Sequence, residues 1–133
     1  MRRTGIGAKW SRWSPQMQAV LRIVAAFLFM LAGTIKLLGF PGGMPGGGTV
    51  ALASQMGIGA ILETVGGGLI LIGLFTRPVA FILCGEMAVA YFQFHFPQGF
   101  WPNLNGGTTA VIYCFLWLYF SAAGAGAWSV DAR

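Results

Sequence analysis

Two apolar stretches separated by a short polar break decide the fold of this chain: ETVGGGLILIGLFTRPVAFILCGEMAVAYF, residues 63–92. The apolar runs to which they belong cover about residues 55–75 and 78–94, and a membrane-spanning helix needs roughly 20 such residues. Between the runs, Thr76 is a candidate helix cap and Pro78 suits the first turn of the next helix. A link this short predicts a tight hairpin of two antiparallel helices.

Two further apolar runs flank the hairpin, at about residues 16–38 and 108–124. The connecting segments 39–54 and 95–107 are rich in glycine and proline, so we expect them to be irregular loops. The sequence therefore predicts an all-α membrane protein. We expect one domain over residues 1–133, built as a bundle of four transmembrane helices.

The composition is that of a chain surrounded by lipid rather than by water. Hydrophobic residues make up 56% of the 133 residues and charged residues only 8%, against about 25% charged residues in ordinary soluble domains. Three acidic and eight basic side chains are too few to cover the surface of a soluble fold of this size. The 21 glycines suit the close packing of helices in a bilayer.

The net charge of +5 is concentrated at the start of the chain, where four of the eight basic residues precede the first apolar run: Arg2, Arg3, Lys9 and Arg12. A nucleic-acid-binding surface would spread its bases over one face of the fold. A basic flank is instead typical of the cytoplasmic side of a membrane helix, beside anionic lipid. We therefore expect the chain to contact the lipid bilayer and not nucleic acid.

The other flanking bases give the predicted orientation. Arg77 lies in the link between the second and third runs and Arg133 in the tail, whereas the loops 39–54 and 95–107 carry no Lys or Arg. The positive-inside rule then places both termini in the cytoplasm of a bacterium, with the helices in its inner membrane. Aromatic side chains at the two ends are expected in the interfacial belts: Phe96, Phe100 and Trp101 outside, and Trp10, Trp13 and Trp128 inside.

Four ionisable side chains interrupt the apolar runs: Arg22, Lys36, Glu63 and Glu86. A charge at the bilayer centre costs about 2.5–3.5 kcal/mol on insertion scales, so such groups face the bundle interior and find partners. At about 1.5 Å per residue, both acids lie about 12–13 Å below the outer boundary, with Lys36 above them and Arg22 below. Helical side chains lean toward the helix N-terminus, which predicts the ion pairs Lys36–Glu63 and Arg22–Glu86.

Two helix faces are expected to meet in the interior. Arg22 and Lys36 are 14 residues apart, which places them within about 40° of each other around the first helix. Three further residues complete this stripe: Ala26, Phe29 and Gly33. On the second helix, Glu63 shares a face with glycines that allow a neighbouring helix to approach closely: Gly59, Gly66 and Gly73.

The four buried charges form the candidate functional centre, since intramembrane ionisable groups are functional candidates by default. The alternative is that two acids and two bases only lock the bundle together. His95, at the outer end of the third run, either hydrogen-bonds the adjacent loop or exchanges protons at the outer surface, because an imidazole titrates at about pH 6.5. We assign no catalytic residue.

The sequence contains no pattern typical of a metal site or of a covalently bound cofactor. The one histidine has no partner ligands at metal spacing, and the glycine-rich segment 42–48 lacks the lysine of a phosphate loop. Cys84 and Cys114 lie inside apolar runs without a CxxC motif. We expect both to pack as small hydrophobic side chains.

Four segments of the chain resemble the DoxX family of small membrane proteins. They are LRIVAAFLFMLAGTIKLLGF at residues 21–40, the hairpin stretch 63–92, HFPQGFWPNLNGG at residues 95–107, and the closing WSVD at residues 128–131. The resemblance covers nearly the whole chain. It implies a four-helix membrane bundle, which agrees with the helices expected from the apolar runs.

The same resemblance implies redox work at the membrane. The family takes its name from a subunit of an archaeal terminal oxidase complex, one relative belongs to a thiosulfate:quinone oxidoreductase, and a mycobacterial member is linked to an oxidoreductase complex for oxidative-stress resistance. The leading hypothesis is an accessory or quinone-interacting subunit of a membrane oxidoreductase complex, in which a protein partner supplies the electrons. Its polar centre would consist of Arg22, Lys36, Glu63 and Glu86.

Two alternative functions stay open. The first is a small proton-coupled transporter, which would need to form a homo-oligomer to enclose a pathway. The second is a structural membrane subunit without activity of its own.

Overall fold

The computed structural model describes residues 5–132, and every regular element within that range is helical. The long helices are α2 (Ser14–Leu38), α3 (Gln55–Ile72), α4 (Thr76–Ala90) and α6 (Thr108–Ala123). The short elements are α1 (Gly5–Ser11), the π-helical turn η1 (Tyr91–His95), the 3₁₀ turns η2 (Phe96–Gln98) and η3 (Val130–Ala132), and α5 (Pro102–Asn105).

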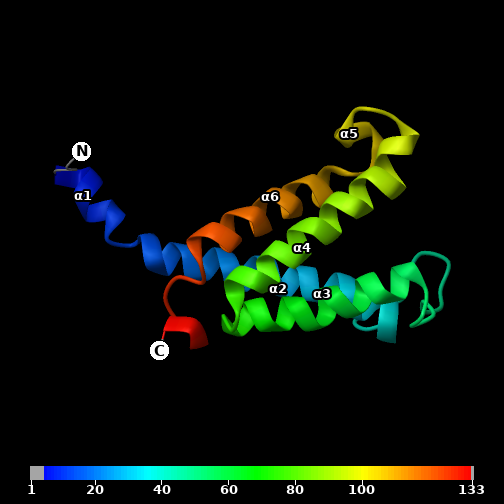
Figure 1. Ribbon diagram of the computed structural model, residues 1–133, viewed down its shortest axis with the longest axis horizontal. Helices are drawn as coiled ribbons and strands as arrows, with labels where there is room; N and C mark the ends of the chain where they lie inside the picture. The colour runs from blue at the N-terminus through cyan, green and yellow to red at the C-terminus, as the bar shows by residue number, and fades with distance from the viewer. Residues whose placement is uncertain (1–4, 133) are drawn as a thin grey trace.

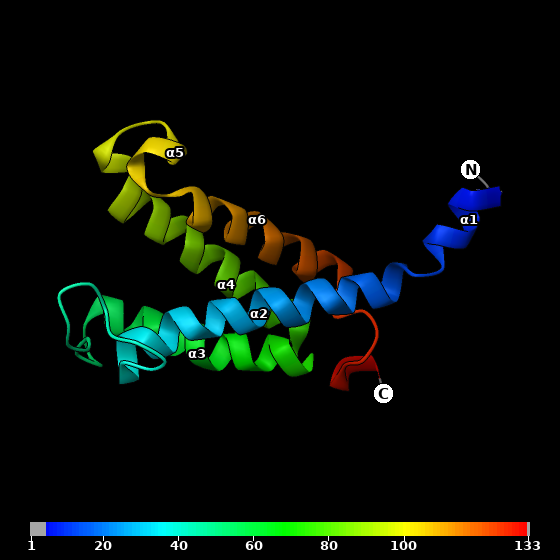
Figure 2. The same ribbon diagram turned by 180° about the vertical axis from the view of Figure 1, so that it is seen from behind.

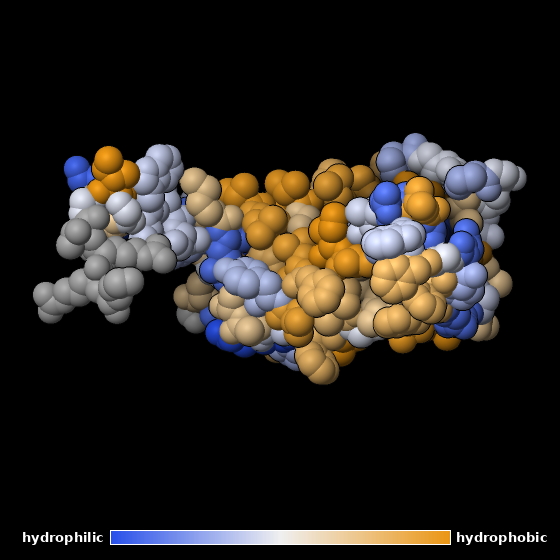
Figure 3. All heavy atoms as spheres, turned by 90° about the horizontal axis from the view of Figure 1, so that it is seen from above, coloured by the Kyte–Doolittle hydropathy of each residue, from blue (hydrophilic) through white to orange (hydrophobic). Residues whose placement is uncertain are grey.

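Three helical segments are long and apolar enough to cross a membrane: Ser14–Leu38, Gln55–Ile72 and Thr76–Gln98. Helix α6 is also apolar but has only 16 residues. Large apolar side chains such as Phe27, Phe81 and Phe115 are exposed on these helices, and Figure 3 shows apolar residues across the middle of the molecule. These surfaces suit lipid contact, while the crossing by α6 stays a prediction.

Local sequence explains where the first two long helices begin and end. Pro15 occupies the first turn of α2, a position that proline favours. The Ser54 side chain caps α3 by accepting a hydrogen bond from the N–H of Gly57 at 3.0 Å. Helix α3 ends at Ile72, earlier than the expected residue 75, because Gly73 adopts the left-handed conformation with φ 71°.

The predicted cap at the start of α4 is wrong. Thr76 is the first residue of the helix, and no side chain at this turn caps it. Asp131 does so from the other end of the chain, because its carboxylate accepts hydrogen bonds from the N–H groups of Phe75 and Thr76, each at 2.9 Å. A carboxylate satisfies N–H groups that lack partners within the helix and is also favoured by the helix dipole.

The long helices pair as two hairpins. Helix α2 packs along α3, and α4 packs along α6. Figures 1 and 2 show that the two pairs lie close together near the α3–α4 turn and diverge toward the end that carries α5. The molecule is therefore wedge-shaped, with its hairpins apart at one end.

The core lies where the two hairpins meet. Phe29 of α2 packs edge-on against Trp117 of α6, with ring centroids 5.2 Å apart. Gly66 of α3 allows Leu83 of α4 to approach so closely that a Cβ at position 66 would lie 2.9 Å from the leucine Cδ2. The predicted interior stripe of α2 is confirmed, because Arg22, Ala26, Phe29 and Gly33 are all buried.

The two ends of the molecule differ in chemistry. Helix α1, the α3–α4 turn and the C-terminal segment lie toward one end, and loop 39–54 and α5 lie at the other (Figure 1). The basic residues Lys9, Arg12 and Arg77 therefore lie toward the end opposite loop 39–54 and α5. Arg2, Arg3 and Arg133, which also support the orientation argument, lie outside the described residues. That this end faces the cytoplasm stays a prediction.

Candidate functional site

A cleft lies between α3 and α4, toward the end at which the hairpins diverge. Its volume is about 610 Å³, which falls within the range of small-molecule sites. Its walls are largely aliphatic and aromatic, with contributions from Ile58, Leu62, Ile82, Val89 and Phe94. Its polar lining residues include four of the five site residues expected from the sequence: Lys36, Glu63, Glu86 and His95.

The predicted ion pair between Lys36 and Glu63 is confirmed. The Lys36 ammonium lies 3.2 Å from Oε1 and 3.3 Å from Oε2 of the Glu63 carboxylate. The Glu63 side chain is only 5% exposed and that of Lys36 is 31% exposed, so the acid is buried and the base reaches it from the cleft. Such a charge-assisted contact stabilises the buried Glu63 carboxylate, which water hydrates little.

Close helix packing brings this pair together. Gly33 of α2 lies against α3 so tightly that a Cβ there would be 2.4 Å from Oγ1 of Thr64 and 2.6 Å from the carbonyl oxygen of Ala60. Lys36 follows Gly33 by three residues, on the same side of α2. Glycine at position 33 therefore lets the lysine of one helix reach the buried acid of the next.

Glu86 of α4 brings a second carboxyl group to the same place. A Cβ at Gly59 would lie 3.1 Å from Oε2 of Glu86 and 3.8 Å from Oε2 of Glu63, so both acids meet over this glycine. The two carboxyl groups are within hydrogen-bonding reach, and Lys36 is close enough to interact electrostatically with Glu86. Oε1 of Glu86 is buried and has no hydrogen-bond partner among the described residues. It is thus a buried acceptor without a partner, on a side chain that lines the cleft.

His95 lies near the mouth of the cleft, at the end of the π-helical turn η1. Its Nδ1 is 3.3 Å from the backbone oxygen of Asn105, and its ring centroid is 6.3 Å from that of Tyr91. The contact with Asn105 fits the interpretation in which this histidine binds the adjacent loop. Its other ring nitrogen, Nε2, is not engaged by that contact, and the side chain also lines the cleft.

The predicted pair between Arg22 and Glu86 is wrong. The buried Arg22 guanidinium donates hydrogen bonds to the backbone oxygens of Ala125 at 2.5 Å, Ala127 at 3.0 Å and Trp128 at 2.8 Å. The arginine leans toward the helix N-terminus as expected, but there the C-terminal segment, residues 124–132, occupies the space and supplies carbonyl groups. Arg22 therefore lies outside the cleft and belongs to a separate polar cluster.

Backbone contacts fasten the C-terminal segment to the hairpins. The N–H of Ala127 donates to the carbonyl of Pro15 at 3.1 Å, and the N–H of Asp131 donates to that of Gly73 at 2.8 Å. Together with Arg22, these bonds join the segment to α2 and to the end of α3. The segment lies at the end of the molecule opposite the one at which the hairpins diverge (Figure 1).

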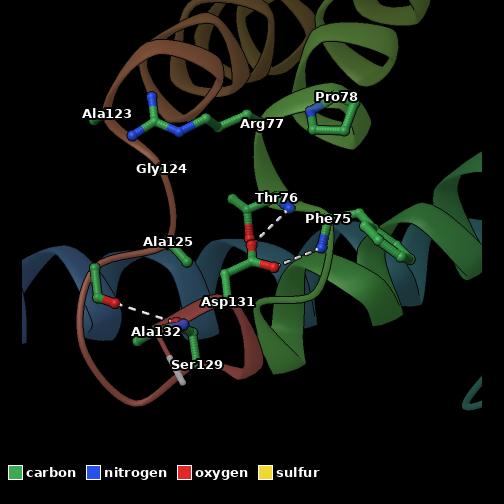
Figure 4. A pocket seen from close by; sticks show the side chains of 11 residues that line it. Phe75, Thr76, Arg77, Pro78, Ala123, Gly124, Ala125, Ser129, Asp131 and Ala132 are labelled. Atoms are coloured by element: carbon green, nitrogen blue, oxygen red, sulfur yellow. Dashed lines mark hydrogen bonds between the residues drawn. The ribbon is translucent and has the colours of Figure 1, made fainter.

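A second cavity of about 380 Å³ lies between this segment and the start of α4. Figure 4 shows the Asp131 side chain pointing at Phe75 and Thr76, and the Arg77 side chain reaching across to the end of α6. There the Arg77 guanidinium donates a hydrogen bond to the backbone oxygen of Ala122. A cation at a helix C-terminus is favoured by the helix dipole, so Arg77 and Asp131 both complete helix ends.

Asp131 is charged at neutral pH. Burial alone would raise the pKa of its carboxyl group, but hydrogen bonds from Thr76 and Phe75 and the positive charge of Arg22 together lower the pKa below its ordinary value of 3.8. The ionised carboxylate is the form that caps α4.

Sequence reasoning missed three residues that the structure brings into prominence: Asp131, Gln55 and Gln93. Asp131 is one of only three acids in the chain, and that scarcity was a signal. Gln55 and Gln93 exchange hydrogen bonds between their side-chain amides, beside the cleft that Gln55 lines. No charge or periodicity marks these two glutamines in the sequence.

Neither a metal centre nor a thiol–metal site is formed by residues 5–132, in which no group of three or more His, Cys, Asp or Glu side chains could hold a metal ion. Cys84 of α4 and Cys114 of α6 have their Sγ atoms 3.7 Å apart. Both are free thiols that pack against the apolar core, as expected for small hydrophobic side chains.

Comparison with known proteins supports the family resemblance. The DoxX family model matches residues 17–96, a range that includes Lys36, Glu63, Glu86 and His95. An uncharacterized protein of Haemophilus influenzae is 45% identical over 125 residues, which cover 92% of this chain and 93% of that protein. No solved structure matches the chain. The chain is therefore a multi-pass membrane protein that belongs to the DoxX family.

Proposed function

We propose that this protein binds a quinone-type ligand in the cleft between α3 and α4, as an accessory subunit of an oxidoreductase complex in a bacterial inner membrane. The observation that carries the proposal is a cleft of about 610 Å³ with apolar walls and a cluster of three ionisable side chains, Lys36, Glu63 and Glu86. A quinone has the matching division into a polar ring and an apolar tail.

The polar groups of the cleft suit a ring that carries oxygen atoms. Two contacts of Lys36 go to Glu63, which leaves one N–H of its ammonium for a ligand carbonyl or hydroxyl oxygen. Oε1 of Glu86 is buried without a partner among the described residues, and a rotation of this side chain, which lines the cleft, would bring the oxygen to a ligand hydroxyl. A donor and an acceptor side by side can therefore hold either a quinone carbonyl or a hydroquinone hydroxyl group.

The apolar walls suit the rest of such a molecule. Ile82 and Val89 on α4 and Ile58 on α3 line the cleft and are also exposed at the surface of their helices. In a bilayer these side chains face acyl chains, so a lipid-soluble ligand could enter between the helices without crossing water. The chain offers no cofactor motif of its own, and for this reason we assign electron transfer to a protein partner.

Binding of a benzoquinone that carries a decyl tail to the purified protein in lipid nanodiscs tests the proposal. Glu86→Leu keeps the volume of the side chain but removes the open acceptor, and we expect it to weaken binding about 5- to 150-fold, or about 1–3 kcal/mol. Glu86→Gln retains an amide oxygen and should weaken binding much less. Phe115→Leu, at an exposed position on α6, serves as the control outside the cleft.

Decylbenzene, which has the tail but no ring oxygens, separates recognition of the ring from partition into lipid. If it competes as well as the quinone does, or if Glu86→Leu binds the quinone as tightly as the parent protein, quinone recognition at this site is disproved. Purification from native membranes in mild detergent tests the role as a subunit, because an accessory subunit should carry redox proteins with it.

A further inference from the structure

Two glutamine side chains, Gln55 and Gln93, join α3 to η1 beside the cleft. The side-chain amide of Gln93 donates to Oε1 of Gln55 at 3.1 Å, and the amide of Gln55 donates to Oε1 of Gln93 in return. Gln55 lines the cleft, and so do His95 and Gln98, which closely follow Gln93 in the chain. Both glutamines are exposed, so the amide pair lies at the surface beside the cleft and not in the core.

The position of the pair makes it a connection between the two hairpins. Gln55 is the first residue of α3, and Gln93 is the middle residue of η1, which continues α4. At this end of the molecule the hairpins diverge (Figures 1 and 2). Long side chains at these two positions thus span a region in which the helix backbones are apart.

The chemistry of the pair allows it to open. Both side chains are neutral and exposed, so water can replace either hydrogen bond at little net cost. One partner lies on a π-helical turn, a rare geometry that is frequent at functional sites. By contrast, the Lys36–Glu63 contact deeper in the cleft is charged and its acid is buried.

We propose that the Gln55–Gln93 amide pair is a gate that controls access to the cleft from the aqueous side at this end of the molecule. This inference deepens the proposed function, since it concerns entry to the same site. When the pair is closed, it separates the water at the membrane surface from Lys36, Glu63 and Glu86. When it opens, the polar cluster becomes accessible to water and protons.

A cysteine probe inside the cleft tests the gate without any ligand. Gly85 lines the cleft, and a Cβ at this position would have no other atom within 4 Å, so Gly85→Cys fits without rearrangement. The probe is introduced together with Cys84→Ser and Cys114→Ser, and its reaction rate with a charged, water-soluble thiosulfonate is measured in nanodiscs. We expect Gln55→Ala and Gln93→Ala each to raise this rate about tenfold, because either substitution breaks both amide bonds.

Two further variants separate gating from general loosening of the fold. Gln55→Glu combined with Gln93→Lys replaces the amide pair by an ion pair and should return the rate to the parent value. Asn103→Ala removes an exposed amide of α5 at the same end of the molecule and should leave the rate unchanged. Unchanged labelling in both Gln→Ala variants, or equal acceleration in the Glu/Lys variant, would disprove the gate.

The two proposals can fail separately. If the Gln→Ala variants accelerate labelling while the parent protein binds no quinone, the gate stands and the proposed ligand is wrong. If quinone binds and labelling does not respond to the amide pair, the ligand stands and the gate is wrong.

Discussion

Five ionisable side chains of this protein form two separate clusters. Lys36, Glu63 and Glu86 meet in the cleft, whereas Arg22 and Asp131 hold the C-terminal segment. The first cluster has two acids for one base, and the second has one of each. Substitutions in the first are therefore expected to alter ligand binding and electrostatics, and those in the second to alter stability.

Lys36→Met is expected to destabilise the protein, because it leaves the Glu63 carboxylate buried without its cation. A hydrogen bond to a charged group contributes about 1.5–3 kcal/mol, and we expect a loss in that range in thermal unfolding followed in detergent. Combining Lys36→Met with Glu63→Leu removes both charges and should recover part of the loss. Strictly additive losses in the double variant would show that the two side chains do not interact.

Asp131→Asn should change how stability depends on acidity. The folded protein holds the pKa of Asp131 below its ordinary value of 3.8, so the ionised carboxylate stabilises the fold above that pH and this contribution is lost as the pH falls through the folded pKa. The midpoint of thermal unfolding should differ between parent and variant by a constant amount near neutrality. That difference should shrink below about pH 4. A difference that stays the same in acid would refute the capping role of the carboxylate.

The Lys36–Glu63 pair could be predicted because it depends only on depth and on the direction in which helical side chains lean. The shared level of Glu63 and Glu86 follows from the same count. Arg22 could not be assigned correctly, because its partners are backbone carbonyls of a segment that has no periodic pattern. The N–H groups of an arginine can donate their hydrogen bonds to neutral oxygens, so pairing opposite charges wrongly predicted Glu86 as the partner of Arg22.

At the level of helices, glycines determine which pairs come close. Gly33 lies in direct contact with α3, where a Cβ would be 2.4 Å from Oγ1 of Thr64. A Cβ added at Gly85 of α4 would instead have no neighbouring atom within 4 Å. A glycine-to-alanine substitution therefore adds a methyl group to a tightly packed site at position 33 and to an open site at position 85.

Gly33→Ala is expected to destabilise the protein by about 1–3 kcal/mol, because α2 and α3 must move apart to admit the methyl group. Gly85→Ala should instead stabilise it by up to about 1 kcal/mol, since alanine is the better helix former. Unfolding by denaturant or heat in detergent measures both. Equal effects of the two substitutions would mean that α2 and α3 are not packed through Gly33.

The long helices were predictable from apolar runs, and their limits agree to within a few residues at most ends. The π-helical turn η1 could not be predicted in the same way. Its five residues, Tyr91–His95, carry no local sequence signal for the wider turn of a π-helix. Contacts with the loop that follows, such as that between His95 and Asn105, accompany this geometry. The Gln55–Gln93 pair depends in turn on η1 and on the divergence of the hairpins, so a pattern within one helix could not reveal it.

At the level of the whole molecule, α1 and the α3–α4 turn, which carry or adjoin Lys9, Arg12 and Arg77, lie toward one end, and loop 39–54 and α5 lie at the other (Figure 1). A cysteine in loop 39–54 should therefore react from outside the cell, and one in the C-terminal segment should not. Gly43→Cys and Ala132→Cys, each with Cys84 and Cys114 replaced by serine, test this with a membrane-impermeant maleimide on intact cells. Labelling of Ala132→Cys alone would show that the orientation is the reverse of the predicted one. Labelling of both variants would show that loop 39–54 and the C-terminal segment lie on the same side of the membrane.

The dependence of Arg22 on carbonyl groups that follow it by 103 to 106 residues constrains how the protein is made. Its first long helix leaves the ribosome well before those carbonyls have been synthesised. Throughout translation the guanidinium must be satisfied by water, lipid headgroups or the insertion machinery. The bundle can therefore reach its final packing only after residues 125–128 have been synthesised, and a nascent chain truncated before residue 125 would carry a buried arginine without its permanent partners.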